Sequence, residues 1–384
     1  MHLHTSPFAK SVEDEFDTFK YTNLKETYDS FVRSKQIVTT LPTGFSLEYL
    51  SLDSDLDAVK SFINTYYSKG RSSLIYTDED MNYFKNTDAK IISVKHEGKL
   101  AAILILEILT YRHGDKLIKG GFIDTTCVHP KIRKCNLFPF LVFHALKVTI
   151  DNGGEILTAN TCNDLKMYEL AHYPDYRITL SNRLRPLNIN TGKVYSMFNV
   201  PLNNNFKEVT LNDMRFINDF NVAFQPIYND AMLTELMKVC LVYTTGLSYA
   251  DDTSKVCNVS DASKVCNASD SHATPNISNV QRRKINGQFI MFDVRHLRYN
   301  GVAIKFAIIK QHINISETSV FIKQVFNDLR DNHGVDAVIF NNNPSLKKFG
   351  KYFYCVKDDM VRYYTWNYFP KIGKDDIFYL GSKQ

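Results

Sequence analysis

The segment GGFIDTTCVHPKIRKCNLFPFLVFHALK, residues 120–147, carries the strongest structural signal in this sequence. Its first part is rich in apolar and β-branched residues, which favour a strand that ends near Val128. A basic turn follows, and then an apolar segment with a helical pattern that contains Leu137, Leu141 and Leu146. The sequence therefore predicts a strand, a basic turn and a helix in direct succession.

The same order of elements occurs twice along the chain. Each copy consists of two strands, a helix, a glycine turn and a further strand. The elements of the first copy are predicted at 99–109, 119–128, about 137–151, Gly153–Gly154 and 155–160. Those of the second copy are predicted at 287–294, 302–310, 319–332, Gly334 and 335–340. This repetition predicts two similar α/β halves.

The composition is that of a globular protein large enough for two domains, with 384 residues, 44% of them hydrophobic and 23% charged. A net charge of +5 does not support a nucleic-acid-binding protein. The longest apolar stretch, Leu100 to Leu109, is about half of a membrane span, and the N-terminus does not resemble a signal peptide. We therefore expect a cytoplasmic protein without stable membrane insertion.

The cysteines argue against a metal centre and against a disulfide scaffold. There are seven of them, an odd number, and none forms a CxxC pair, so reduced thiols are expected. Cys127 and Cys162 end predicted strands and have no nearby His–Asp pattern, so neither is expected to be a catalytic nucleophile.

The predicted organisation has three parts. Residues 1–39 are charged and weakly periodic and form an N-terminal arm, while the two halves are expected at 40–202 and 203–384, divided by a proline and an asparagine run. Within the second half, the tandem repeat TSKVCNVSD/ASKVCNASD lies in a polar region that cannot bury much apolar surface. A disordered insertion is therefore predicted at 244–283.

The basic turn of the opening segment has the features of an anion-binding site. The first turn of a helix has unsatisfied N–H groups and a partial positive charge, and Lys131, Arg133 and Lys134 add full charges beside it. A phosphate or pyrophosphate is the expected ligand of such a site. The alternative, a solvated basic loop without a ligand, remains open on the local sequence alone.

This strand–turn–helix unit resembles the one with which acetyltransferases of the GNAT type hold the pyrophosphate of coenzyme A. In that fold the strand before the turn diverges from its neighbour and exposes main-chain N–H groups. Such groups stabilise the oxyanion that forms when an amine attacks a thioester.

A more specific resemblance is to the N-myristoyltransferase family. The residues of the opening segment that match the family's motif are Cys127, Val128, His129, Lys131, Arg133, Leu137 and Pro139. The further segments that are similar to the family lie at 15–22, 40–67, 156–161 and 335–368. The similarity thus follows the family's order from about residue 15 to the C-terminus.

The resemblance implies an α/β (α+β) fold of two tandem GNAT-like halves that share a bent, saddle-shaped mixed sheet. The first half would bind myristoyl-CoA, and the second half would bind the N-terminal glycine of a peptide or protein. The implied activity is that of a monomeric glycylpeptide N-tetradecanoyltransferase, an acyltransferase that needs no metal.

Roles for individual residues also follow from the resemblance. The main-chain amides of Thr125 and Thr126 would form the oxyanion hole, Thr161 would lie beside the acceptor amine, and the C-terminal carboxylate of Gln384 would be the general base. The implied cofactor-binding residues are Thr125, Thr126, Cys127, Val128, Arg133, Lys134, Cys135, Asn136, Leu137, Phe138 and Pro139.

The sequence departs from the family's pattern at several of these positions. Asp124 replaces an asparagine beside the oxyanion residues and should slow acyl transfer unless it is paired or faces away. Lys357 and Asp359 replace glycines, and an acidic substrate-reading loop aligns with the basic segment 66–72. Two alternatives therefore stay open: a protein that binds acyl-CoA or lipidated peptides without turnover, and a short-chain GNAT acetyltransferase.

Overall fold

The structure is a computed structural model. The residues it describes are 41–69, 72–114, 116–133, 135, 137–161, 178–179, 183–184, 206–219, 224–249, 285–299, 301–315, 320–339, 353–354 and 360–366. The predicted N-terminal arm lies outside them.

The first predicted unit is confirmed. Strands β5 (Lys99–His113) and β6 (Lys116–Val128) form an antiparallel hairpin, and the short 3-10 helix η2 (Pro130–Ile132) leads into α4 (Leu137–Asp151). Gly153 has a φ of 75°, the left-handed conformation that glycine adopts without strain. The chain then returns as β7 (Ile156–Thr161), parallel to β6.

The second unit repeats the first. Strands β14 (Phe289–Tyr299) and β15 (Val302–Ile313) form the hairpin, followed by α7 (Val320–Asp331) and by β16 (Ala337–Ile339), which runs parallel to β15. Gly334 follows α7 with a φ of 59°, as predicted for a left-handed cap. The predicted fold class of two GNAT-like halves is therefore confirmed.

The described strands form two main sheets. The first has the order β1-β4-β5-β6-β7-β18-β8, with β10 paired to β5, and the second has the order β16-β15-β14-β3-β2, with β11 paired to β14. The further strands of the first sheet are β1 (Phe45–Leu50), β4 (Lys90–His96), β8 (Ile178–Thr179), β10 (Gln225–Ile227) and β18 (Met360–Trp366). Those of the second are β2 (Ser68–Lys69), β3 (Ser72–Ile75) and β11 (Cys240–Thr244).

Two short ribbons complete the described strands. One pairs β9 (Arg183–Leu184) with β17 (Phe353–Tyr354), and the other pairs β12 (Ser248–Tyr249) with β13 (Ile285–Asn286). Residues 244–249 of the predicted insertion thus belong to β11, to β12 and to the turn between them, and residues 250–284 lie outside the described residues.

The halves share their sheets by exchanging strands. Strands β2 and β3, from the first half of the sequence, pair into the second sheet through β14, while β10 and β18, from the second half, pair with β5 and β7 of the first sheet. Each sheet therefore depends on both halves of the chain.

The remaining helices are α2 (Leu56–Tyr66), α3 (Asp78–Asn86), α5 (Leu211–Arg215) and α6 (Asp230–Val239), with a 3-10 helix, η4 (Phe216–Asp219), after α5. The N-cap of α2 is Asp55. Its side chain makes no capping hydrogen bond. The buried residues of α2 are Val59, Phe62 and Ile63, and Leu56 is half-buried.

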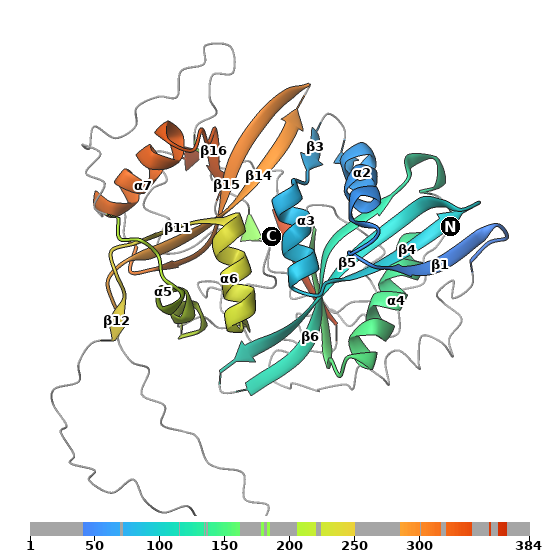
Figure 1. Ribbon diagram of the computed structural model, residues 1–384, viewed down its shortest axis with the longest axis horizontal. Coiled ribbons are helices and arrows are strands. Elements are labelled where there is room, and N and C mark those ends of the chain that lie inside the picture. Colours follow the sequence, from blue (N-terminus) through green and yellow to red (C-terminus); the bar gives the residue numbers. More distant parts are fainter. Residues whose placement is uncertain are drawn as a thin grey trace, which may run out of the picture.

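Three apolar cores hold the molecule together. Helix α4 covers one face of the first sheet, α7 covers one face of the second, and a central core with α2, α3 and α6 fills the space between the sheets. Figure 1 shows α3 and α6 side by side at the centre, with α7 and α4 on opposite outer sides. The face of each hairpin opposite its own helix therefore points toward the other half.

Candidate functional site

Strand β6 changes its pairing at Asp124. On the β5 side, Thr125 lies opposite Ile105 and Ile123 lies opposite Leu106, so Asp124 is the extra residue of a β-bulge. On the β7 side, the last ladder pair among the described residues joins Ile123 to Ala159. Beyond that pair β7 continues to Thr161 as the partner of β18. We call this region, β6 from Asp124 to Val128 and β7 from Asn160 to Thr161, the fork.

The direction of the main-chain amides along β6 follows from one hydrogen bond. His129 N–H donates to the carbonyl of Ala101 on β5 (2.9 Å). Because amides alternate along an antiparallel strand, those of Cys127 and Thr125 point toward β5, and those of Thr126 and Val128 point into the fork. Of the two predicted oxyanion donors, Thr126 therefore has the amide that faces the fork.

The residues of β6 whose amides point toward β5 have buried side chains. Thr125 and Cys127 are buried, with exposed fractions of 1% and 2%, and Cys127 belongs to the central core. Burial raises the pKa of the Cys127 thiol to about 12, against a smaller opposing effect of Arg133. This agrees with the expectation that Cys127 is not a nucleophile.

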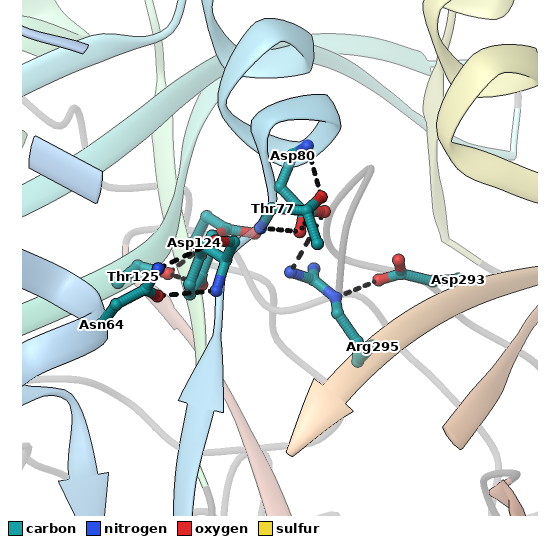
Figure 2. A network of polar contacts seen from close by, with 8 residues as sticks. Asn64, Thr77, Asp80, Asp124, Thr125, Asp293 and Arg295 are labelled. Atoms are coloured by element: carbon teal, nitrogen blue, oxygen red, sulfur yellow. Dashed lines mark hydrogen bonds and ion pairs between the residues drawn. The ribbon is translucent and has the colours of Figure 1, made fainter. Parts of the chain in front are cut away.

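The bulge is fixed by a short hydrogen-bonded network that sequence analysis did not anticipate (Figure 2). Thr125 Oγ1 donates to Asp124 Oδ2 (2.8 Å), and the Tyr76 hydroxyl shares its single proton between Thr125 Oγ1 and Asp124 Oδ2, which lies 3.4 Å away. Burial raises the pKa of Tyr76 well above its ordinary value, and the Asp124 carboxylate raises it further. Tyr76 therefore remains a neutral donor.

Tyr76 is held in place from two sides. The Asn64 side chain of α2 donates to the Tyr76 carbonyl (2.9 Å) and accepts from its N–H (2.7 Å). On the other side α3 begins with a capping box, in which Thr77 Oγ1 accepts from Asp80 N–H (3.2 Å) and Asp80 Oδ2 accepts from Thr77 N–H (2.9 Å). The local sequence thus fixes the segment that reaches the bulge.

Arg295 of β14, in the second half of the chain, contacts the same network at Tyr76. Its guanidinium carbon lies 5.5 Å from the centre of the Tyr76 ring, its Nε is 2.7 Å from Asp293 Oδ2, and its Nη1 is 3.9 Å from Asp80 Oδ1. Burial alone lowers the pKa of Arg295, but Asp293, Tyr76, Asp80 and Asp124 raise it well above its ordinary value. Arg295 is therefore a permanent buried cation at the junction of the halves.

The basic turn lies at the other end of the fork. Arg133 is exposed, and its Nε and Nη2 donate to the carbonyls of Val128 (3.3 Å) and Tyr66 (3.2 Å). Lys131 is also exposed, and its N–H donates to His129 Nδ1 (3.3 Å). These cations stand directly before the first turn of α4, the arrangement that binds anions.

The predicted cofactor-binding residues occupy one continuous strand–turn–helix. Cys135, Phe138 and Pro139 are half-buried and Leu137 is buried. Lys134 and Asn136 lie outside the described residues. Thr161 ends β7 opposite Arg362 of β18, so it stands on the strand that forms the other arm of the fork.

Other predicted features remain untested by the geometry. Gln384, Lys357 and Asp359 lie outside the described residues, so the terminal base and the altered glycine motif stay predictions. Within the described residues no group of three or more His, Cys, Asp or Glu side chains is arranged to hold a metal ion. Among the helices of the described residues, none combines the length and the apolar content needed to cross a bilayer.

Tyr76 and Arg295 were not predicted as site residues. For Arg295 a signal was present: Asp293 and Arg295 stand two apart in the apolar strand IMFDVRHL, and therefore on one face. Opposite charges on one buried face indicate an internal ion pair. For Tyr76 no local pattern distinguishes it from the other tyrosines.

No protein-family model and no curated protein matches this sequence. The solved structures give a clear answer on the fold. One structure of Saccharomyces cerevisiae N-myristoyltransferase with bound myristoyl-CoA matches 88% of this chain and 83% of its own, at 13% identity and a TM-score of 0.60. A second, with myristoyl-CoA and inhibitors, matches 88% and 84%, at 14% identity and a TM-score of 0.59. At this identity the likeness shows a shared fold.

Proposed function

We propose that this protein is an N-acyltransferase that takes its acyl group from a coenzyme A thioester. The observation that carries the proposal is the fork, where the amides of Thr126 and Val128 point away from β5 within a few residues of a basic turn and the start of α4. These groups fit two parts of an acyl-CoA. The pyrophosphate needs cations and free N–H groups, and the thioester oxygen needs a hydrogen-bond donor.

In this proposal each part of the strand–turn–helix has a separate task. Lys131, Arg133 and Lys134, with the first turn of α4, bind the pyrophosphate. Two positions that are basic in the resembling family, Cys135 and Asn136, are neutral here and contribute contacts without charge. The Thr126 amide donates to the thioester oxygen as negative charge develops on it. Thr125 supports the strand through its buried hydroxyl.

We further propose that the acyl group is myristoyl and that the acceptor is the amine of an N-terminal glycine. The support is the resemblance of the segment from Cys127 to Pro139 to the N-myristoyltransferase motif, together with the shared fold. Thr161, on the other arm of the fork, is the residue proposed to lie beside that amine.

The test uses the full chain with radiolabelled myristoyl-CoA, acetyl-CoA and a library of peptides that begin with glycine. We expect transfer from myristoyl-CoA. In parallel, R133A should weaken binding of myristoyl-CoA about tenfold, because a charge-assisted contact is lost. R298A, which removes an exposed arginine of β14, should leave the affinity unchanged.

The possible outcomes separate the alternatives. Binding of myristoyl-CoA without transfer to any peptide would indicate a protein that has lost turnover. Transfer from acetyl-CoA alone would indicate a short-chain acetyltransferase. If the chain bound no coenzyme A derivative, the proposal would be wrong.

A further inference from the structure

Asp124 occupies a special position in the fork. It is the bulged residue of β6 and the first residue beyond the last β6–β7 ladder pair. Because these strands are parallel and Ile123 pairs with Ala159, Asp124 stands level with Asn160, one residue before Thr161. It also lies two residues before Thr126, whose amide points into the fork. Its carboxylate is half-buried and stands where β6 stops pairing with β7.

The orientation of this carboxylate is fixed. The Thr125 hydroxyl donates to Oδ2, the Tyr76 hydroxyl shares its proton between Oδ2 and Thr125 Oγ1, and Tyr76 is itself held by Asn64. Both donors are buried, with exposed fractions of 1% for Thr125 and 4% for Tyr76. Asp124 is thus a positioned carboxylate rather than a solvated surface charge.

Asp124 belongs to a connected set of buried or half-buried charged groups that contains both signs. Arg295 interacts electrostatically with Asp124, Asp80 and Asp293, and Lys310 interacts with Asp293, Arg295 and Glu107. The acidic members of this connected set are Asp80, Glu107, Asp124 and Asp293, and the basic members are Arg295 and Lys310.

We propose that Asp124 binds the ammonium form of the acceptor amine and takes up its proton. The inference rests on the proposed function and assigns to Asp124 the task that the family resemblance gives to the carboxylate of Gln384. This role also removes the expected slowing of acyl transfer by Asp124, because proton uptake makes the carboxyl neutral before the oxyanion forms beside it.

The ammonium group transfers one proton to Asp124, and the neutral amine attacks the carbonyl carbon of the thioester to form a C–N bond. The carbonyl electron pair moves to oxygen, where the Thr126 amide stabilises it, and returns as the C–S bond breaks. The second proton lost from nitrogen converts the departing thiolate to a thiol. Asp124 then releases its proton to solvent.

The main test is the substitution D124N, which keeps an oxygen for the hydrogen bonds from Thr125 and Tyr76 but neither binds the ammonium as an ion pair nor accepts its proton. We expect kcat/KM for peptide acylation to fall about 100-fold near pH 6, with an unchanged Kd for myristoyl-CoA. The defect should shrink near pH 9, because an α-amine with an ordinary pKa of about 8 then reaches the site already neutral.

The pH dependence is assigned to Asp124 by comparison with the wild type, because Lys310, whose pKa burial lowers to about 8, titrates in both proteins. Tyr76, preceding α3, and Arg295, on β14, keep their protons across this range because the pKa of each is raised. Thr125, from its own strand, does not titrate. A purely structural role of Asp124 would instead give a defect of equal size at every pH, and that result would overturn the proposal.

The comparison variant is a deletion of residues 381–384, which removes the competing carboxylate of Gln384. We expect this variant to retain most of its transfer rate. If the deletion abolished transfer while D124N acted like the wild type at every pH, Gln384 would be the base and the inference would be wrong, although the proposed function would stand. If the wild-type chain transferred no acyl group, both would be wrong.

Discussion

Arg295 shows how one residue sets the charge balance at the junction of the two halves. Its exposed fraction is 4%, and its closest acidic partner, Asp293, is fully buried. Asp293 Oδ1 and Arg295 Nη1 each lack a hydrogen-bond partner within the described residues. The pair therefore depends on charge attraction more than on a complete set of hydrogen bonds, so neither partner is readily replaced alone.

We predict that R295M destabilises the protein by about 3–5 kcal/mol, because it leaves the Asp293 carboxylate buried without its cation. The measurement is urea-induced unfolding followed by circular dichroism. R215M is the matched control, since Arg215 forms an ion pair with Asp230 at the surface. Water screens that pair, so little change is expected. Equal losses in the two variants would contradict the prediction.

At the residue scale, sequence reasoning located the strand–turn–helix but not all of its contacts. The resemblance implies that both Thr125 and Thr126 are amide donors, and it does not show that the amide of Thr125 points toward β5. That distinction depends on the ladder register, which is set by the bulge at Asp124. Likewise Tyr76 reaches Thr125 from 49 residues away, a tertiary contact that no local pattern encodes.

At the scale of elements, glycines set the close approach of α4 and β7 to β6. A Cβ atom on Gly121 would overlap Thr149 Oγ1 of α4, and one on Gly120 would lie 2.8 Å from the carbonyl oxygen of Ile156 on β7. Thr149 is fully buried, and its hydroxyl donates to the carbonyl of Ala145 within α4 (2.8 Å). These contacts position the helix whose first turn belongs to the proposed anion site.

We predict that G121A destabilises the protein by about 1–3 kcal/mol, because the added methyl group overpacks the contact between α4 and β6. The double variant G121A/T149A should recover part of this loss, since T149A removes the overlapping oxygen. Unfolding by urea of both variants, with T149A alone as reference, measures the coupling. Strictly additive effects would show that Thr149 is not the obstructing group.

The elements themselves were largely predictable. The helix predicted at about 137–151 is α4, and the second helix, predicted at 319–332, is α7 (Val320–Asp331). Helix α7 carries a strong periodic pattern, α4 is apolar around most of its surface, and each helix ends shortly before a glycine. Strands β2, β3, β10 and β18 were not assigned to particular sheets, because their partners are distant in sequence. The sequence of a short strand says little about which edge of which sheet it joins.

At the scale of the whole molecule, the exchange of strands makes the two halves interdependent. The first sheet needs β10 and β18 from the second half, and β14 of the second sheet pairs with β3 from the first half. The central core also draws residues from both halves, from Ile103 and Ile105 to Phe289 and Met291. A cut between the halves would expose this core as well as the sheet edges.

We predict that fragments 40–202 and 203–384 do not fold when each is produced alone and that they form one folded complex when produced together. Urea unfolding and the NMR chemical-shift dispersion of each fragment would measure whether it folds. The control is an internal deletion of residues 254–280 in the full chain, which keeps every described strand and should unfold cooperatively. A cooperative transition in fragment 40–202 alone would contradict the prediction.

The position of β18 has a consequence for protein synthesis. Thr161 and Arg362 are partners in the finished sheet, yet about 200 residues separate them in the chain. At about 5–20 residues per second, a ribosome needs roughly 10–40 s to supply the missing strand. Throughout that interval the edge of β7 that β18 will occupy is open to pairing with other nascent chains.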